Sequence, residues 1–196
     1  SQKKWKLALS SFKEGLKYDL KNEWAIQKIG LALEMQGKNN EAIKKYEWLL
    51  ENFSPKLILI MRLSKLYWDE FLFEKGEDIL LRGHKIFPKE TILIEKLVNY
   101  YDSRGLFEDA SKILASFLKL VPNNSTALAK KGFYENELKR PLLALGYFEK
   151  ALAISPDFEW ARIHKIRILF DTKKIKKAEN ELKLFLNNNP DSEWAL

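Results

Sequence analysis

The sequence contains no cysteine, only two histidines, and no apolar run near the ~20 residues of a membrane-spanning helix. Without cysteine, the chain has no disulfide, no thiolate nucleophile and no Cys-rich zinc site. The histidines, His84 and His164, fall at different places in the repeat described below, and we interpret each as an ordinary helical residue. The carboxylates lie mostly on expected solvent faces, and no serine has an evident base. The sequence therefore predicts no enzyme, no catalytic residue, no cofactor and no metal site.

Charge is plentiful by comparison, and it is unbalanced, with a net charge of +7 at pH 7. We interpret the lysines, which are spread along the chain, as solvated helix faces. The alternative is a basic nucleic-acid or anionic-surface binding module, because phosphates attract clustered cations. The cluster that motivates this alternative is Lys173, Lys174, Lys176 and Lys177. No nucleic-acid motif accompanies the cluster, so nucleic acid is not the partner that we expect.

Nothing in the sequence fixes a compartment. Residues 1–6 are basic, but they lead into an amphipathic pattern interrupted by charge and not into the apolar run of a secretory signal. Cytoplasm and periplasm are both compatible with a soluble chain of this composition, and no membrane span is expected in these 196 residues.

A small residue recurs every 34 residues, at Ala8, Ala42, Gly76, Ala110, Ala144 and Ala178. Prolines follow the same period, at Pro88, Pro122, Pro156 and Pro190. A fixed period of this length is typical of repeat architectures, so the sequence predicts a single continuous array. We expect the following parts: residues 1–22 (the second helix of a partial repeat), the full repeats 23–56, 57–90, 91–124, 125–158 and 159–192, and the start of a further repeat at 193–196.

Residues 125–158 are the most regular repeat. Two amphipathic segments are separated by a break at Lys139-Arg140-Pro141, which predicts two helices joined by a short turn. Small Ala144 marks a helix crossing, because helices approach to about 8–10 Å only where the side chains permit it. Phe148, four residues later, is expected to fill the adjacent space. Its equivalents in the other repeats are Phe12, Tyr46, Leu80, Leu114 and Leu182.

Several residues predict where helices begin and end. Asn22 is the expected N-cap of the next helix, and Gly37 is expected to end that same helix. Pro122 is expected to end the preceding helix, and Asn123 is expected to cap the next one.

The repeat at residues 57–90 is the least regular. Phe71 stands where a turn glycine is expected, and Gly76 and Gly83 stand where alanines are expected. Glycine inside a helix costs about 0.5–1 kcal/mol relative to alanine, which indicates that close helix contact is needed there. Phe71, Leu72 and Phe73 form an apolar turn that serves either inter-repeat packing or an exposed patch.

This pattern resembles the tetratricopeptide repeat (TPR) family, and the resemblance covers essentially the whole chain. The matching residues in two of the repeats are Gly30, Leu33, Gly37, Ala42 and Tyr46, and Gly132, Ala144, Phe148, Ala151 and Pro156. Departures are Ser64, Val98 and Ile166 where the family favours glycine, and Lys139 and Lys173 at the turn. The resemblance implies an all-α, right-handed superhelical solenoid of helix-turn-helix repeats, whose concave groove is lined by the first helix of each repeat.

By phase, fourteen residues of the first helices should line that groove. They are Trp24, Gln27, Leu31, Met61, Lys65, Trp68, Glu95, Asn99, Phe133, Asn136, Trp160, Ile163, Arg167 and Phe170. The triplet Glu-Trp-Ala occurs three times in phase, which gives Trp24, Trp160 and Trp194 one equivalent place. Tryptophan is enriched among binding hot spots, but each ring can equally pack on the preceding repeat.

The resemblance implies a protein-binding scaffold without enzymatic activity, with another protein or a peptide in the groove. Some TPR proteins hold a C-terminal carboxylate in a clamp of Lys, Asn and Arg. The corresponding places here carry Gln27, Leu31, Arg62 and Ile92 in one frame, and Glu95, Asn99, Lys130 and Trp160 in another, so we expect no such clamp. An amphipathic helix or an extended apolar segment suits this groove better.

The ends of the sequence leave a further alternative open. The array begins on a second helix and stops four residues into a first helix, so both ends cut through a repeat. We therefore expect a part of a larger protein or assembly, in which the segment could position or regulate an enzyme elsewhere. Uncovered repeat ends would also favour self-association.

Overall fold

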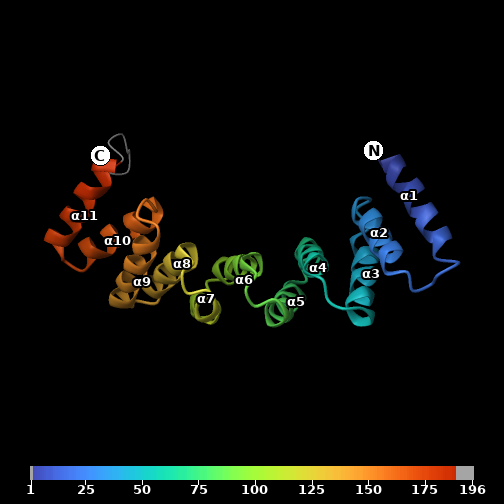
Figure 1. Ribbon diagram of the computed structural model, residues 1–196, viewed down its shortest axis with the longest axis horizontal. Coiled ribbons are helices and arrows are strands. Elements are labelled where there is room, and N and C mark those ends of the chain that lie inside the picture. The colour runs from blue at the N-terminus through green and yellow to red at the C-terminus, as the bar shows by residue number, and fades with distance from the viewer. Residues whose placement is uncertain (1, 189–196) are drawn as a thin grey trace. The chain divides into compact units, whose positions relative to one another are not determined.

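The computed structural model describes residues 2–188, without the side chains of residues 2–4, 8 and 188. Pro190, Trp194 and the partial repeat at residues 193–196 lie outside this range. Residues 2–188 form eleven α-helices (Figure 1), and the prediction of an all-α fold is confirmed. They are α1 (Gln2–Gly15), α2 (Glu23–Glu34), α3 (Asn39–Asn52), α4 (Leu57–Asp69), α5 (Phe73–Ile86), α6 (Thr91–Ser103), α7 (Phe107–Leu120), α8 (Ser125–Glu137), α9 (Pro141–Ile154), α10 (Glu159–Asp171) and α11 (Ile175–Asn188).

The helices keep the register of the sequence period. The first helices of the repeats are α2, α4, α6, α8 and α10, and their first residues are spaced by 34. The second helices, α3, α5, α7, α9 and α11, start with the same spacing. Helix α1 precedes the first pair and corresponds to the lone second helix that the sequence predicts. None of the helices within residues 2–188 combines the length and the apolar character that crossing a membrane requires.

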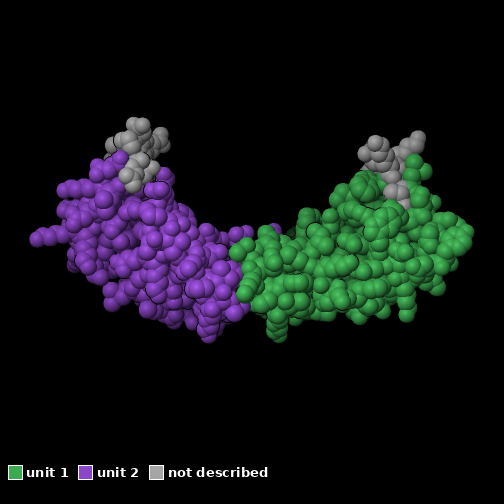
Figure 2. All heavy atoms as spheres, viewed as in Figure 1, with its two compact units in different colours: residues 1–93 green, residues 94–196 purple. Residues whose placement is uncertain are grey.

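The chain divides into two compact units, residues 1–93 and 94–196 (Figure 2). The division falls in the first turn of α6. In unit 1, α2 packs on α1 and α3, and α4 packs on α3 and α5. In unit 2, α8 packs on α7 and α9, and α10 packs on α9 and α11. Within each unit, these helices therefore pack mainly on their neighbours in the sequence, as stacked helix pairs require.

Small residues stand where the two helices of a repeat approach each other. Ala42, Ala110, Ala144 and Ala178 are 0% exposed. A Cβ atom added to Gly132 of α8 would lie 3.1 Å from the carbonyl oxygen of Ala144 in α9. Only a residue without a large side chain fits at such a crossing. The predicted crossings are confirmed at these positions, whereas the side chain of Ala8 is among those not described.

The irregular repeat has the close contacts that its glycines predict. A Cβ atom on Gly76 would lie 2.8 Å from Cδ1 of Trp68, and one on Gly83 would lie 2.8 Å from Cγ2 of Ile60. Both distances are shorter than an ordinary van der Waals contact, so alanine would force a neighbouring side chain to move.

Most of the large residues predicted beside the crossings are buried. Tyr46, Leu80, Leu114 and Phe148 are at most 1% exposed. Their equivalents in the outermost helices, Phe12 of α1 and Leu182 of α11, are only partly buried. Within residues 2–188, α1 packs mainly on α2 and α11 mainly on α10, whereas a helix between two neighbours is covered on both sides.

The turn inside each repeat uses one backbone geometry five times. Residues at one place in the repeat have φ between +57° and +72°, namely Gly37, Phe71, Gly105, Lys139 and Lys173. The following residue donates its N–H to a carbonyl five residues earlier, as from Lys38 to Leu33 (2.9 Å) and from Arg140 to Glu135 (2.8 Å). This is the Schellman pattern of helix C-termini, which favours glycine. Gly37 ends α2 as predicted.

Asparagine caps two of the first helices. The side chain of Asn22 accepts a hydrogen bond from the N–H of Ala25 (2.9 Å), so this predicted cap is confirmed. The predicted cap at Asn123 is wrong by one residue. Asn124 has the extended backbone of a cap and accepts from the N–H of Ala127 (2.8 Å), whereas Asn123 lies in the preceding turn. Pro141 occupies the first turn of α9, as predicted.

The repeated turn gives a stability prediction. The left-handed conformation costs a non-glycine residue about 1–2 kcal/mol, and glycine costs about 0.5–1 kcal/mol in lost chain entropy. Lys139→Gly should therefore stabilise the protein by up to about 1 kcal/mol, measured as a higher urea midpoint. Lys44→Gly, on the exposed side of α3, is the control and should destabilise by about 1 kcal/mol. Equal losses in both variants would contradict the strain at Lys139.

Candidate functional site

The fourteen residues predicted to line a groove all lie on first helices, and none of them is buried. We call the exposed side of the first helices the first-helix face. Three of its aromatic residues are more than one-third exposed: Trp24 at 59%, Trp160 at 38% and Phe170 at 41%. Lys65, Glu95, Asn99 and Arg167 are also exposed. The remaining seven, Gln27, Leu31, Met61, Trp68, Phe133, Asn136 and Ile163, are half-buried.

In unit 1, Trp24 packs on one aromatic ring and remains 59% exposed. Its ring meets Phe12 of α1 edge to face, with centroids 5.3 Å apart, and Lys28 Nζ lies 5.6 Å from the ring centroid. Trp68 lies differently, because its ring covers Gly76 and meets Phe73 of α5 edge to face at 6.0 Å. The same residue type therefore packs inside its own repeat at one place and stands largely in solvent at another.

Ion pairs connect the two first helices of unit 1. Arg62 of α4 approaches Glu34 of α2 at 2.9 Å, and Lys56 approaches Glu23 at 2.5 Å. The buried hydroxyl of Tyr46 donates to the same oxygen of Glu34 (3.2 Å). Burial, and next the negative charge of Glu34, raise the pKa of the Tyr46 phenol, which keeps it a neutral donor. These contacts fix α2 and α4 beside each other through Glu34.

In unit 2, the structure brings together two predicted residues of neighbouring repeats. Phe133 of α8 and Trp160 of α10 have ring centroids 5.9 Å apart. His164, one turn after Trp160, lies 4.3 Å from that ring and stacks on the ring of Phe148 of α9 at 5.9 Å. We call Phe133, Phe148, Trp160 and His164 the aromatic cluster of unit 2.

The sequence did not place His164 in this cluster, although its i,i+4 spacing from Trp160 puts the two on one side of α10. Burial in the cluster, and next the positive charge of Arg167, lower the pKa of the His164 imidazole below 6.5. The neutral ring is thus the form that the folded protein favours.

The apolar turn of the irregular repeat is exposed. Phe71 is 78% exposed and has a φ of +59°, and its ring meets that of Phe73 at 6.0 Å. Of the two alternatives left open by the sequence, Phe71 thus fits the exposed patch, whereas Phe73 also contacts Trp68.

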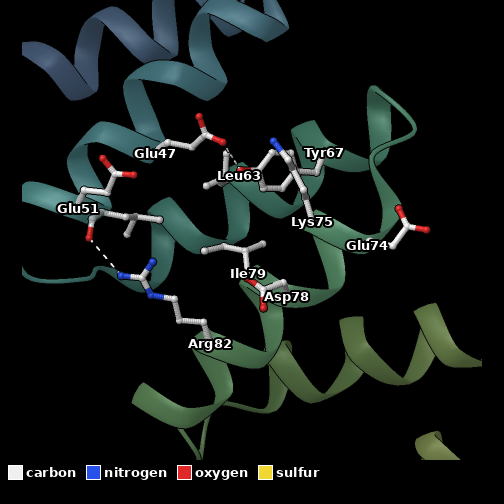
Figure 3. Close-up of a pocket in the computed structure, with 10 residues that line it drawn as sticks. Glu47, Glu51, Leu63, Tyr67, Glu74, Lys75, Asp78, Ile79 and Arg82 are labelled. Atoms are coloured by element: carbon white, nitrogen blue, oxygen red, sulfur yellow. Dashed lines mark hydrogen bonds between the residues drawn. The ribbon is translucent and has the colours of Figure 1, made fainter.

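A pocket of about 420 Å³ lies between α3, α4 and α5 in unit 1 (Figure 3). Four carboxylates line it, from Glu47, Glu51, Glu74 and Asp78, together with Lys75 and Arg82. The hydroxyl of Tyr67 donates to Glu47 (2.6 Å), and Arg82 donates to the backbone carbonyl of Leu50 (3.4 Å). Cations of the pocket itself therefore offset part of its negative charge.

Unit 2 contains a buried polar network that the sequence reasoning missed. Lys131 Nζ donates to Glu135 (2.8 Å) and to the hydroxyl of Ser111 (2.7 Å), which in turn donates to the same Glu135 oxygen (2.6 Å). All three residues are at most 5% exposed. Burial alone would raise the pKa of Glu135, but the hydrogen bonds from Lys131 and Ser111 outweigh it and hold that pKa below its usual range. The i,i+4 spacing of Lys131 and Glu135 was a signal for the pair but not for its burial.

Metal-binding groups do not gather in the part of the chain that the structure describes: no three His, Cys, Asp or Glu side chains there could hold a metal ion. The described chemistry consists of apolar packing, hydrogen bonds and ion pairs.

Comparison with known proteins agrees with the repeat pattern. Residues 137–196 match a family model described as Tetratricopeptide repeat. The structure of MamA protein is 18% identical, with 84% of this chain and 90% of that chain covered and a TM-score of 0.67. MamA from Desulfovibrio magneticus RS-1, residue 41 to the end, is 11% identical, with 88% and 98% covered and a TM-score of 0.65.

YrrB, whose structure is described as that of a TPR protein with an unusual peptide-binding site, is 18% identical, with 83% of this chain and 84% of that chain covered and a TM-score of 0.58. No curated protein sequence matches the chain. At such identities the structural likeness shows the fold, and the resemblance predicted from the repeats is confirmed.

The buried pair gives a second prediction. Glu135→Leu leaves the buried Lys131 ammonium without its carboxylate partner and should destabilise the protein by about 3–5 kcal/mol. In the double variant Lys131→Met/Glu135→Leu the loss should be clearly smaller than the sum of the two single losses, because no unpaired charge remains. Urea unfolding of all four proteins measures this coupling. Additive losses would contradict the pairing, and the exposed pair Asp109–Lys112 is the control, where removal should have little effect.

The aromatic cluster gives a pH prediction. Because the folded pKa of His164 lies below the unfolded value, the unfolded state binds the proton more readily. Stability is therefore fully present above about pH 6.5 and is lost as the pH falls below it. Unfolding free energies between about pH 7.5 and about pH 5.5 should fall more steeply for the wild type than for His164→Phe. Identical slopes would show that His164 is not desolvated.

Proposed function

We propose that the chain is a tetratricopeptide-repeat array, since residues 137–196 match that family model and the fold matches solved TPR structures, and that it is a non-enzymatic scaffold that binds a peptide or protein segment on its first-helix face. The fold by itself specifies no partner, since one fold hosts many functions. The proposal therefore rests on particular side chains of that face. We further propose that the repeats act as a single array within a larger protein or assembly.

The observation that carries the proposal is the exposure of aromatic rings on α10. Trp160 is 38% exposed although it contacts Phe133 and His164, and Phe170 is 41% exposed near the other end of the helix. Arg167 lies between them in sequence and is exposed as well. A rigid aromatic ring with a supported face and a free face offers binding area at low entropic cost.

The first-helix face of unit 1 offers a second set of contacts. Trp24 contacts Phe12 edge to face, and Gln27 and Leu31 follow it on α2. Met61 lies half-buried on α4, and the neighbouring Lys65 pairs with Asp69 at 2.7 Å. The mixture is mostly apolar with scattered charge, which suits an amphipathic helix or an extended apolar segment better than a free carboxylate. YrrB, which shares the fold, is described as having a peptide-binding site, and this description agrees with the proposal.

An affinity experiment tests the proposal. Partners captured by the wild-type chain from extracts of its own cells would be identified, and their affinities measured again with the variant Trp24→Ala/Trp160→Ala/Phe170→Ala. Hot-spot residues cost about 2 kcal/mol or more each, so binding should weaken by at least about 30-fold. The matched control Leu142→Ala/Leu143→Ala/Leu184→Ala removes leucines of α9 and α11 that are 70%, 55% and 53% exposed. It should bind as the wild type does.

Loss of packing must be separated from loss of binding, because Trp160 contacts the aromatic cluster. The single variants Trp24→Ala and Phe170→Ala leave that cluster intact, and circular dichroism with urea unfolding reports their folding. Unchanged affinity in the triple variant would refute the assignment of the first-helix face. Equal weakening in the leucine control would refute it as well, because binding would then depend on exposed apolar area in general.

A further inference from the structure

A second pocket, of about 580 Å³, lies between α7, α8 and α9 in unit 2. It occupies the same place in the repeat pattern as the pocket of Figure 3, shifted by two periods. Leu118 corresponds to Leu50, Lys119 to Glu51 and Lys150 to Arg82. We call this second pocket the α7–α9 groove. Two second helices form its walls and a first helix forms its floor, so it is separate from the first-helix face.

The charges of the two pockets differ although their scaffold is the same. The unit 1 pocket contains four carboxylates and two cations. The α7–α9 groove is lined by Lys119, Lys131 and Lys150, and none of its lining residues is acidic. Glu51 at the equivalent of Lys119 shows that the fold does not require a cation at that place. The positive character of the groove is therefore a property of these side chains and not of the repeat.

One of the three lysines is already neutralised inside the protein. Lys131 is 5% exposed and donates to Glu135 and Ser111, so its charge is balanced within the core. Lys119 and Lys150 are exposed, and within residues 2–188 neither of them forms an ion pair. Glu149, the sequence neighbour of Lys150, lies 4.0 Å from Lys165 instead. Two ammonium groups of the groove thus lack a carboxylate.

The ring of Tyr147 contacts two of these cations. Its ring centroid lies 5.1 Å from Lys131 Nζ and 5.6 Å from Lys150 Nζ. A ring face attracts each ammonium but does not cancel its charge. Because the Lys150 ammonium has no carboxylate partner, it would attract an anion, and the low-dielectric walls of the groove strengthen that attraction.

The rest of the lining is apolar. Leu118 and Leu128 lie in the groove, and Ile154 at its edge is 42% exposed. A ligand that satisfies the groove needs an apolar group for this lining and negative charge for Lys119 and Lys150. Nucleic acid fits less well, because it requires a longer row of cations and free aromatic rings for its bases. Lys131 and Lys150 already contact the ring of Tyr147.

We propose that the α7–α9 groove is a second binding site, which takes an acidic peptide segment with an apolar side chain flanked by carboxylates. The apolar side chain lies against Leu118, Leu128 and Ile154, and the carboxylates pair with Lys119 and Lys150. Binding there is independent of the first-helix face, because it uses α7, α8 and α9 from the side of the second helices. The chain can then hold two different segments at once.

The test uses the full chain and a labelled synthetic peptide of alternating Glu and Leu, with binding measured by fluorescence anisotropy. Lys119→Glu/Lys150→Glu should weaken binding about tenfold or more. The matched control Lys176→Glu/Lys177→Glu changes the net charge equally on exposed positions of α11 and should retain affinity within about twofold. Trp24→Ala/Phe170→Ala, which alters only the first-helix face, should bind the peptide as the wild type does.

Other outcomes would overturn the proposal. Equal weakening in both charge variants would show attraction to net charge without a site. An all-Glu peptide that binds as tightly as the Glu/Leu peptide would show that the apolar lining of the groove does not contribute to binding. Tighter binding of an oligothymidylate than of the peptide, lost on Lys119→Glu/Lys150→Glu, would assign the groove to nucleic acid. No binding of the peptide at low ionic strength would exclude the site.

Discussion

The close approach of the two helices of each repeat is the constraint on which the rest of the structure depends. At Gly30 a Cβ atom would lie 2.5 Å from the ring of Tyr46, and at Gly132 it would lie 3.1 Å from the ring of Phe148. The large ring of the second helix thus takes the space that the small residue of the first helix leaves free. Each pair then presents apolar side chains that only the next pair can cover, so repeats must stack. The buried positions follow the 34-residue period because they all serve this one contact.

Given that contact, the turn between the helices has little freedom. The chain must reverse within a few residues, and the left-handed conformation with its Schellman hydrogen bonds achieves this at Gly37, Phe71, Gly105, Lys139 and Lys173. Three of these five residues have a side chain and take the conformation against their own preference. Helix pairing therefore outweighs local propensity at the turn. All three are exposed, but only Phe71 is apolar, and at 78% exposure neither local preference nor burial accounts for a phenylalanine there.

A scaffold this uniform leaves specificity to the residues that differ between repeats. Equivalent second-helix pockets carry mainly carboxylates in unit 1 and lysines in unit 2. Equivalent first-helix positions carry Trp24 in one repeat and Trp160 in another, with different neighbours and different exposure. Stacking and turn geometry do not restrict these side chains, so they are free to serve recognition. The buried network of Lys131, Glu135 and Ser111 serves both stacking and recognition, because it joins α8 to α7 and also contributes a lysine to the floor of a pocket.

The sequence by itself determined the fold class, the repeat length and the register of the helices. Small residues and prolines recur every 34 residues, and equivalent helices begin with the same spacing. It also placed the groove candidates on the exposed side of the first helices, as a consequence of helical phase. It could not assign the aromatic partners of His164, the burial of Lys131 and Glu135, or the two different pockets, and it placed one cap at Asn123 instead of Asn124. Only the tertiary structure decided these features. Apart from the cap, they depend on which side chains of different helices meet, as Phe148 meets His164 and Ser111 meets Lys131. Periodicity reports only which side of a single helix is buried.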